Sequence, residues 1–278
     1  MHLRPLPLAA AGIVLGLGVV LTQPLKTLSA AEAPPIAASD TAGAAAQPMA
    51  AGDVHDRDGI RPGTDATASG SAAARTRAAL SALAKHVNRQ SHPEALRRAF
   101  HAYYTFKATH PDQVRKPYLY FVDYGLDSRT RRGYIFDMVA LKIVDGPFTV
   151  AHGRGSAPGA EGVPTRFSNK KDSAMSSLGL YLAQEIYAFS GKSGGRRYHS
   201  TGLRLRGLSG QFNSAARARG VVVHGAPYVT PARAGRSEGC PAMEESRART
   251  LLPRISNGSL VYLFSPRDET WIREDPWS

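Results

Sequence analysis

The sequence contains a single cysteine, Cys240, and few acidic residues for its size. One cysteine excludes an intramolecular disulfide and any cysteine-rich metal site. Only 22 Asp and Glu residues oppose 35 Lys and Arg residues in the 278-residue chain, which gives a formal net charge of +13. A surface with this charge prefers polyanions such as wall polymers, acidic lipid headgroups or nucleic acid. We expect no nucleic-acid partner, because the sequence has no helix-turn-helix, zinc-finger or aromatic RNA-binding signature.

A long apolar run is found only near the start of the chain. Residues 1–31 are typical of an export signal: Arg4 precedes a nearly apolar run from Leu6 to Leu21, and Ser29-Ala30-Ala31 offers small residues for cleavage. The run is short for a membrane span, and the sequence leaves open whether it is cleaved or kept as an anchor. We therefore expect a periplasmic or cell-envelope protein, with a membrane tether only if the signal is uncleaved.

Composition divides the rest of the chain into four parts. Residues 32–75 are mostly Ala, Gly, Pro, Asp, Ser and Thr and predict a disordered linker, because they offer little apolar surface to bury. Residues 76–110 show two apolar stripes at helical spacing, separated by Ser91-His92-Pro93, and predict a helical hairpin. Residues 111–265 form the main folded domain, and residues 266–278 form a C-terminal tail.

Short alternating runs punctuated by glycine dominate the main domain and predict mostly antiparallel strands. We expect strands at 118–122, 133–139, 141–144, 148–151, 202–208, 221–223 and 260–264, and short helices at 210–219 and 241–255. Residues 180–189 fit either a strand or a short helix. The predicted fold class is mainly β (α+β), with a few helices and the N-terminal helical hairpin.

Cys240 and His224 form the candidate reactive pair. The β-branched run 221–223 predicts a buried strand, so His224-Gly225 stands at a strand end and Gly239-Cys240 closes the following loop. Strand ends and the loops that leave them often hold catalytic groups. An imidazole within hydrogen-bond reach accepts a thiol proton and holds the two groups as an ion pair. The alternative is that Cys240 is a small buried filler of the core.

The residues around Cys240 suit a nucleophile. A helix starting at Pro241 would place its positive end near the sulfur, and Arg236 would add a second positive charge, so both would lower the thiol pKa. Backbone N–H groups at Gly239 and Cys240 would form an oxyanion hole. Ser237 would either order the loop or bind the substrate.

These motifs resemble the catalytic domain of the murein L,D-transpeptidases. In that family a His-Gly pair is followed by Ser/Thr-His-Gly-Cys, which corresponds here to His224-Gly225 and Ser237-Glu238-Gly239-Cys240. Further segments between residues 118 and 265 resemble one branch of the family: Val150-Ala151-His152-Gly153, Phe167-Ser168-Asn169, Ser176-Ser177-Leu178-Gly179, Gly207-Leu208 and Asn213.

The resemblance implies an L,D-transpeptidase-like β-sandwich and a ping-pong acyl transfer on peptidoglycan stem peptides, with no cofactor and no metal. Cys240 would attack the carbonyl before the terminal D-alanine, and His224 would transfer the proton to the leaving amine. The Gly225 carbonyl would orient His224. Transfer to another stem, hydrolysis, as in an L,D-carboxypeptidase, and non-catalytic wall binding stay open as outcomes, and the oligomeric state is unknown.

The chain departs from the family pattern on both sides of Gly239-Cys240. Glu238 replaces a common histidine, and Pro241-Ala242 replaces the polar or basic residues that commonly follow the cysteine. Arg236 and Arg233 are candidates to bind the substrate carboxylate instead. His152 is the rival base or a residue of the substrate cleft, and Asn169, Ser176 and Ser177 are candidate substrate contacts. His101, His110 and His199 have no partners at metal-ligand spacing.

Overall fold

The computed structural model describes residues 64–159 and 162–277. The predicted export signal and the linker up to residue 63 lie outside the described residues, so both stay predictions. Within the described part, no helix combines the length and the apolar character needed to cross a membrane.

Two helices precede the sheet, where the sequence predicts a hairpin. Helix α1 spans Thr64–Leu83, a short 3-10 turn η1 follows at Ala84–His86, and α2 spans Ala95–Thr109. The aromatic side chains of α2 are buried, and the helix contacts α1 and the strands β1 (Tyr118–Asp123) and β12 (Leu260–Phe264). α1 begins inside the segment that composition predicts to be a linker.

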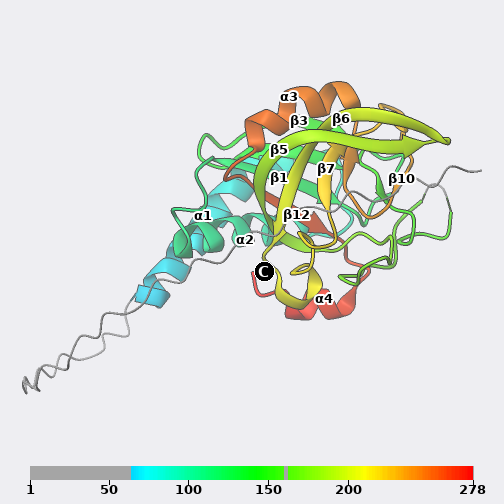
Figure 1. Cartoon of the computed structure of the whole chain (residues 1–278). Helices are drawn as coiled ribbons and strands as arrows, with labels where there is room; N and C mark the ends of the chain where they lie inside the picture. The colour runs from blue at the N-terminus through cyan, green and yellow to red at the C-terminus, as the bar shows by residue number, and fades with distance from the viewer. Residues whose placement is uncertain (1–63, 160–161, 278) are drawn as a thin grey trace, which may run out of the picture. The chain divides into compact units, whose positions relative to one another are not determined.

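One eight-stranded sheet forms the body of the domain, with strand order β11-β7-β6-β5-β12-β1-β2-β3 (Figure 1). The strands of all sheets in the described residues are β1 (Tyr118–Asp123), β2 (Gly133–Asp137), β3 (Lys142–Phe148), β4 (His152–Gly153), β5 (Gly179–Ser193), β6 (Arg196–Gly207), β7 (Val222–Gly225), β8 (Val229–Thr230), β9 (Arg233–Ala234), β10 (Arg236–Ser237), β11 (Ala242–Met243) and β12 (Leu260–Phe264). β10 with β4 and β8 with β9 form two separate two-stranded sheets. The main sheet is antiparallel except for β1 with β12 and β7 with β11. The mainly β fold class is confirmed.

The hairpin of β5 and β6 extends beyond its neighbours in the sheet (Figure 1). β12 pairs with β5 only at residues 179–182, and β7 pairs with β6 only at residues 202–204. The outer part of the hairpin is therefore a two-stranded ribbon, paired to its end at Ser193 and Arg196. Phe189 of β5 and Tyr198 of β6 lie on this ribbon and line the cavity of the candidate site.

Several predicted elements differ from the observed ones. Helix α3 spans Glu245–Ile255, not 241–255, because the fully buried Ala242 and Met243 pair with β7 as strand β11. Of the predicted strand 148–151, only Phe148 belongs to a strand, and Ala151 makes an isolated bridge to Ala242.

The predicted helix 210–219 is reduced to the 3-10 turn η2 (Gly210–Phe212). The buried side-chain amide of Asn213 donates to the Leu178 and Leu180 carbonyls at 3.1 and 2.9 Å. These bonds hold the loop against β5 and compete with continued helical pairing. The C-terminal tail, which carried no sequence signal, contains helix α4 (Glu269–Glu274), whose Trp271 is fully buried.

Candidate active site

Parallel pairing of β7 and β11 brings His224 and Cys240 together. Ala242 is the register partner of His224, and the His224 N–H lies 3.4 Å from the carbonyl of Pro241, the residue after Cys240. Both residues line one cavity of about 260 Å³, which Phe189, Tyr198 and Tyr228 also line. We call this cavity the aromatic pocket.

The His224 ring is held in one tautomer. Its Nδ1 lies 3.0 Å from the Gly225 carbonyl oxygen, which can only accept, so Nδ1 carries the proton and Nε2 is the acceptor. The contact expected between His224 and the Gly225 carbonyl is therefore confirmed. Phe189 stacks on the His224 ring at 4.1 Å between centroids, and His224 is only 2% exposed. Burial lowers the pKa of His224 to about 4, although the Gly225 carbonyl opposes the shift.

Gly225 allows helix α3 to approach the site. A Cβ at this position would lie 2.3 Å from Ser200 Oγ and 2.9 Å from both Ala248 Cβ and Glu245 Cα. These contacts are too close for any side chain, so the packing requires glycine at position 225. Helix α3 therefore packs against Gly225, and none of its residues lines the aromatic pocket.

The Cys240 thiol is partly buried and donates toward the Gly220 carbonyl at 3.9 Å. Burial raises its pKa, whereas a hydrogen bond from the Val222 N–H and the charge of Arg219 lower it and Glu238 raises it further. The expected contribution of a helix end is absent, because α3 begins only at Glu245. Together with the lowered pKa of His224, these effects favour a neutral thiol and a neutral imidazole over the predicted ion pair.

Ser237 shapes the loop that carries Cys240. Its hydroxyl donates to the Cys240 carbonyl at 2.6 Å and accepts from the Gly239 N–H at 3.1 Å. The Gly239 N–H is therefore engaged and does not face an oxyanion, which leaves the Cys240 N–H as the candidate donor. Gly239 has a φ of +124°, and a Cβ there would lie 2.8 Å from the Met175 carbonyl oxygen. Only glycine fits this turn.

Ser176 and Ser177, predicted substrate contacts, lie beneath the loop with 0% and 1% exposure. Ser176 Oγ accepts from the Gly153 N–H at 3.0 Å and donates to the Gly239 carbonyl at 3.1 Å. Ser177 Oγ accepts from the Tyr181 hydroxyl at 2.9 Å and from Arg219 at 3.3 Å. Ser176 thus holds the cysteine loop directly, whereas Ser177 bonds to Tyr181 and Arg219.

Asn169 also has protein partners. Its amide donates to the Gln211 carbonyl and Ser214 Oγ, and its oxygen accepts from the Ala215 N–H. The residue lines a separate cavity of about 300 Å³ that shares no residue with the aromatic pocket. The structure therefore does not bring Asn169 to Cys240.

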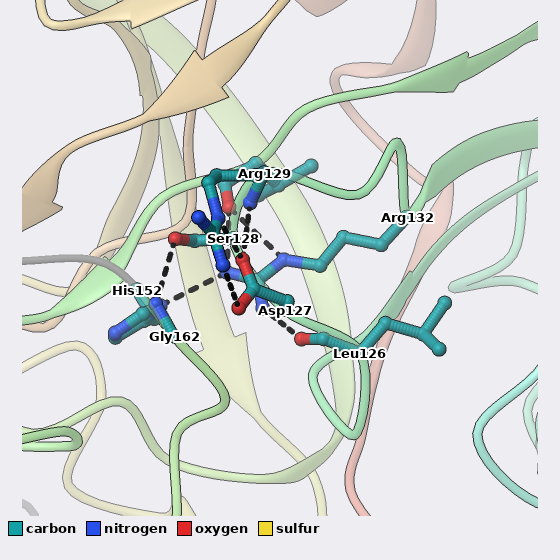
Figure 2. Close-up of polar contacts among 8 residues, drawn as sticks. Leu126, Asp127, Ser128, Arg129, Arg132, His152 and Gly162 are labelled. Atoms are coloured by element: carbon teal, nitrogen blue, oxygen red, sulfur yellow. Dashed lines mark hydrogen bonds and ion pairs between the residues drawn. The ribbon is translucent and has the colours of Figure 1, made fainter.

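His152 is fully buried and held by Arg132 (Figure 2). The Arg132 guanidinium donates to His152 Nδ1 at 2.9 Å, to the Leu126 carbonyl at 2.6 Å and twice to the Val150 carbonyl. Burial and the charge of Arg132 lower the pKa of His152 to about 3. Because Nδ1 is occupied, Nε2 carries the proton and has no lone pair to accept one from a thiol. His152 belongs to the framework of the site, which favours His224 as the base.

A second cavity, of about 370 Å³, meets Cys240 from another side. We call it the basic pocket, because Arg154, Lys171 and Arg219 line it together with the carboxylates of Asp172 and Glu238. The sequence motifs did not predict these three cations, because each lies in a loop far from Cys240 along the chain. Arg236 lines the aromatic pocket, whereas the exposed Arg233 lines neither.

Comparison with known proteins identifies a family for most of the chain. The sequence model of the L,D-transpeptidase catalytic domain matches residues 87–264. No curated protein matches the chain.

Similar solved structures include an L,D-transpeptidase from Mycobacterium smegmatis, with 13% identity and a TM-score of 0.32 over 53% of this chain and 58% of that one. An L,D-transpeptidase from Mycobacterium tuberculosis H37Rv has 16% identity and a TM-score of 0.30 over 53% and 57%. L,D-transpeptidase 3 from Mycobacterium tuberculosis, with a faropenem-derived adduct, has 14% identity and a TM-score of 0.30 over 53% and 60%. The chain thus spans between half and two thirds of the length of these structures.

Proposed function

The chain belongs to the L,D-transpeptidase catalytic domain family, and we propose that it is an exported cysteine acyltransferase that acts on peptidoglycan stem peptides through a thioester on Cys240. One observation carries the proposal: the only cysteine and a histidine whose Nε2 is kept as an acceptor line the same pocket. A nucleophile and its general base need such a shared pocket, in which the thiol can come within hydrogen-bond reach of the ring.

In the acylation step, the Cys240 sulfur attacks the carbonyl carbon between the L-centre of diaminopimelate and the terminal D-alanine. His224 Nε2 takes the thiol proton and returns it to the leaving D-alanine amine, so a thioester and free D-alanine result. The Cys240 N–H is our candidate donor to the oxyanion. Before attack, the thiol must turn from the Gly220 carbonyl toward the His224 ring, a tightening that is common between free and substrate-bound enzymes.

In the second step, the thioester is resolved by the side-chain amine of another stem peptide. His224 Nε2 takes a proton from that amine and returns it to the cysteine sulfur as the new amide forms. Water in place of the amine would give hydrolysis. We favour transfer to the amine.

The decisive experiment is intact mass spectrometry with a stem tetrapeptide that ends in diaminopimelate-D-alanine. We expect release of D-alanine, an acyl adduct on Cys240 and a cross-linked dimer of stems. Cys240→Ala abolishes all three, while His224→Gln slows adduct formation and leaves the fold intact by circular dichroism. A hydrolysed tripeptide without dimers would identify the hydrolase alternative. Retention on sacculi by the parent and by Cys240→Ala, with no turnover by either, would identify the wall-binding alternative and refute the proposal.

The location belongs to the same proposal. Action on peptidoglycan requires export, which residues 1–31 predict from their charge and apolar run. Fractionation of cells that express the full chain tests this. The protein should be found in the periplasm or cell envelope, and a cytoplasmic protein with an intact N-terminus would contradict it.

A further inference from the structure

The two pockets that meet at Cys240 differ in chemistry. The aromatic pocket presents the rings of Phe189, Tyr198 and Tyr228 beside the charged side chains of Lys192, Arg236 and Glu238, whereas the basic pocket has no aromatic ring and is lined mainly by charged side chains. Both pockets include Gly220, Glu238 and Cys240. A substrate that places its reactive carbonyl at Cys240 meets cations on both sides, three in the basic pocket and two in the aromatic pocket.

Arg219 provides the fixed part of that wall. It donates to the Ser168 and Met175 carbonyls at 2.7 and 2.8 Å, and to the hydroxyls of Ser177 and Ser173 at 3.3 Å each. With these four acceptors it braces the loop and contributes charge, but it has little donor capacity left for a ligand.

Arg154 and Lys171 have donors to spare. Arg154 uses its Nε for both carboxylate oxygens of Glu238, at 2.8 Å each, in an ion pair whose side chains are 60% and 73% exposed. Its terminal Nη groups make no hydrogen bond to any described residue. Lys171 is exposed and forms no ion pair within the described part of the chain. The guanidinium of Arg154 has five N–H donors and the ammonium of Lys171 has three. Of these, the contact with Glu238 uses only the Nε–H of Arg154.

The charged side chains of the basic pocket sum to a net charge of one positive, which one bound anion would balance. Arg154, Lys171 and Arg219 contribute three positive charges, and Asp172 and Glu238 contribute two negative ones. Pro241-Ala242 provides no cation after the nucleophile. The two terminal Nη groups of Arg154 form a fork that is suited to the two oxygens of a carboxylate.

We propose that the basic pocket is a carboxylate subsite, in which Arg154 and Lys171 bind a carboxylate of the stem peptide close to the bond that Cys240 attacks. The ligand class rests on the proposed function, since stem peptides carry such groups. The carboxylate belongs either to the departing D-alanine or to the diaminopimelate side chain. This assignment replaces Arg236 and Arg233 as the carboxylate ligands.

The test compares two alkylating agents at the single cysteine. Iodoacetate and iodoacetamide attack the same thiolate and differ in charge, so the ratio of their rates reports attraction of a carboxylate and cancels changes in thiol pKa. Neutralising one nearby charge should change this ratio by about threefold to tenfold at low salt. We expect Arg154→Gln and Lys171→Gln to lower the ratio, and Glu238→Gln to raise it.

Lys170→Gln is the matched control, because Lys170 is the exposed neighbour of Lys171 and does not line the pocket. Its ratio should stay at the parental value. An unchanged ratio in both Arg154→Gln and Lys171→Gln would overturn the subsite. So would a fall in Arg236→Gln alone, which would place the carboxylate in the aromatic pocket.

Stem tetrapeptides that end in D-alanine or in D-alanine amide separate the two sources of the carboxylate. If the departing residue supplies the group, the amide raises KM in the parent, and Arg154→Gln removes the difference. If diaminopimelate supplies it, amidation of its side-chain carboxylate has this effect instead. Equal KM values for all three peptides would overturn the assignment. No turnover of any peptide by the parent would refute the proposed function, while the alkylation ratio still decides whether the pocket binds a carboxylate.

Discussion

Cys240 should behave as a protonated thiol at neutral pH. Burial lowers the pKa of His224 to about 4, so the imidazole is neutral above pH 5 and offers no positive charge to a thiolate. Burial also raises the thiol pKa above its ordinary value of 9.0. At pH 7, about 1% or less of the thiol is then ionised. A cysteine-histidine ion pair would be mostly ionised at the same pH.

The measurement is the rate of Cys240 alkylation by iodoacetamide from pH 6 to pH 10.5. We expect the rate to rise about tenfold per pH unit up to at least pH 9, because the thiolate fraction follows a single high pKa. The rate at pH 7 should be about a hundredth or less of the plateau. Liquid chromatography with mass spectrometry gives the rate directly, since no other cysteine is present.

His224→Gln is the control variant. If the resting pair is neutral, the variant keeps the parental profile, because the imidazole does not stabilise a thiolate. A plateau between pH 6 and pH 8 in the parent that disappears in His224→Gln would show an ion pair and refute the reasoning.

Three substitutions test the framework of the site by urea unfolding. Ser237→Ala removes two hydrogen bonds across the cysteine loop and should lower the unfolding free energy by about 1–2 kcal/mol; no change would mean that the loop does not depend on them. Gly239→Ala adds a Cβ 2.8 Å from the Met175 carbonyl oxygen at a φ of +124° and should cost about 1–3 kcal/mol, with slower acylation of the thiol; a parental midpoint would contradict the observed turn. Arg132→Met leaves His152 and two buried carbonyls without their donor and should cost about 3 kcal/mol or more, whereas a neutral effect would show that water replaces the guanidinium.

The sequence predicts the reactive pair because its signal is local. A β-branched run before His224 predicts a strand, and Gly239 before Cys240 predicts the close of the loop that follows. The contact between His224 and the Gly225 carbonyl follows from the family resemblance and is present. The interval after Cys240 is harder to predict. Apolar side chains from Ala242 onward fit either a helix or a buried strand, and the pairing with β7 decides for the strand.

The surroundings of the site depend on long-range contacts that leave no local pattern. Arg132 and His152 are 20 positions apart, and Arg154 and Glu238 are 84 apart. A buried arginine and an exposed one look alike in sequence, since their roles depend on which carbonyls or carboxylates the fold brings to them. Ser176 shows the same limit, because a serine that binds a substrate and one that holds a buried carbonyl have the same side chain.

Burial of the reactive pair links the fold to its chemistry. Phe189, on the ribbon of β5 and β6, covers the His224 ring, so the stacking that fixes the base also suppresses its charge. In the mechanism that we propose, ionisation of Cys240 coincides with attack on a bound substrate, when His224 takes the thiol proton and the developing oxyanion is stabilised. A resting thiol is oxidised more slowly than a thiolate. The neutral pair thus protects the single cysteine of a chain that we propose to act outside the cytoplasm.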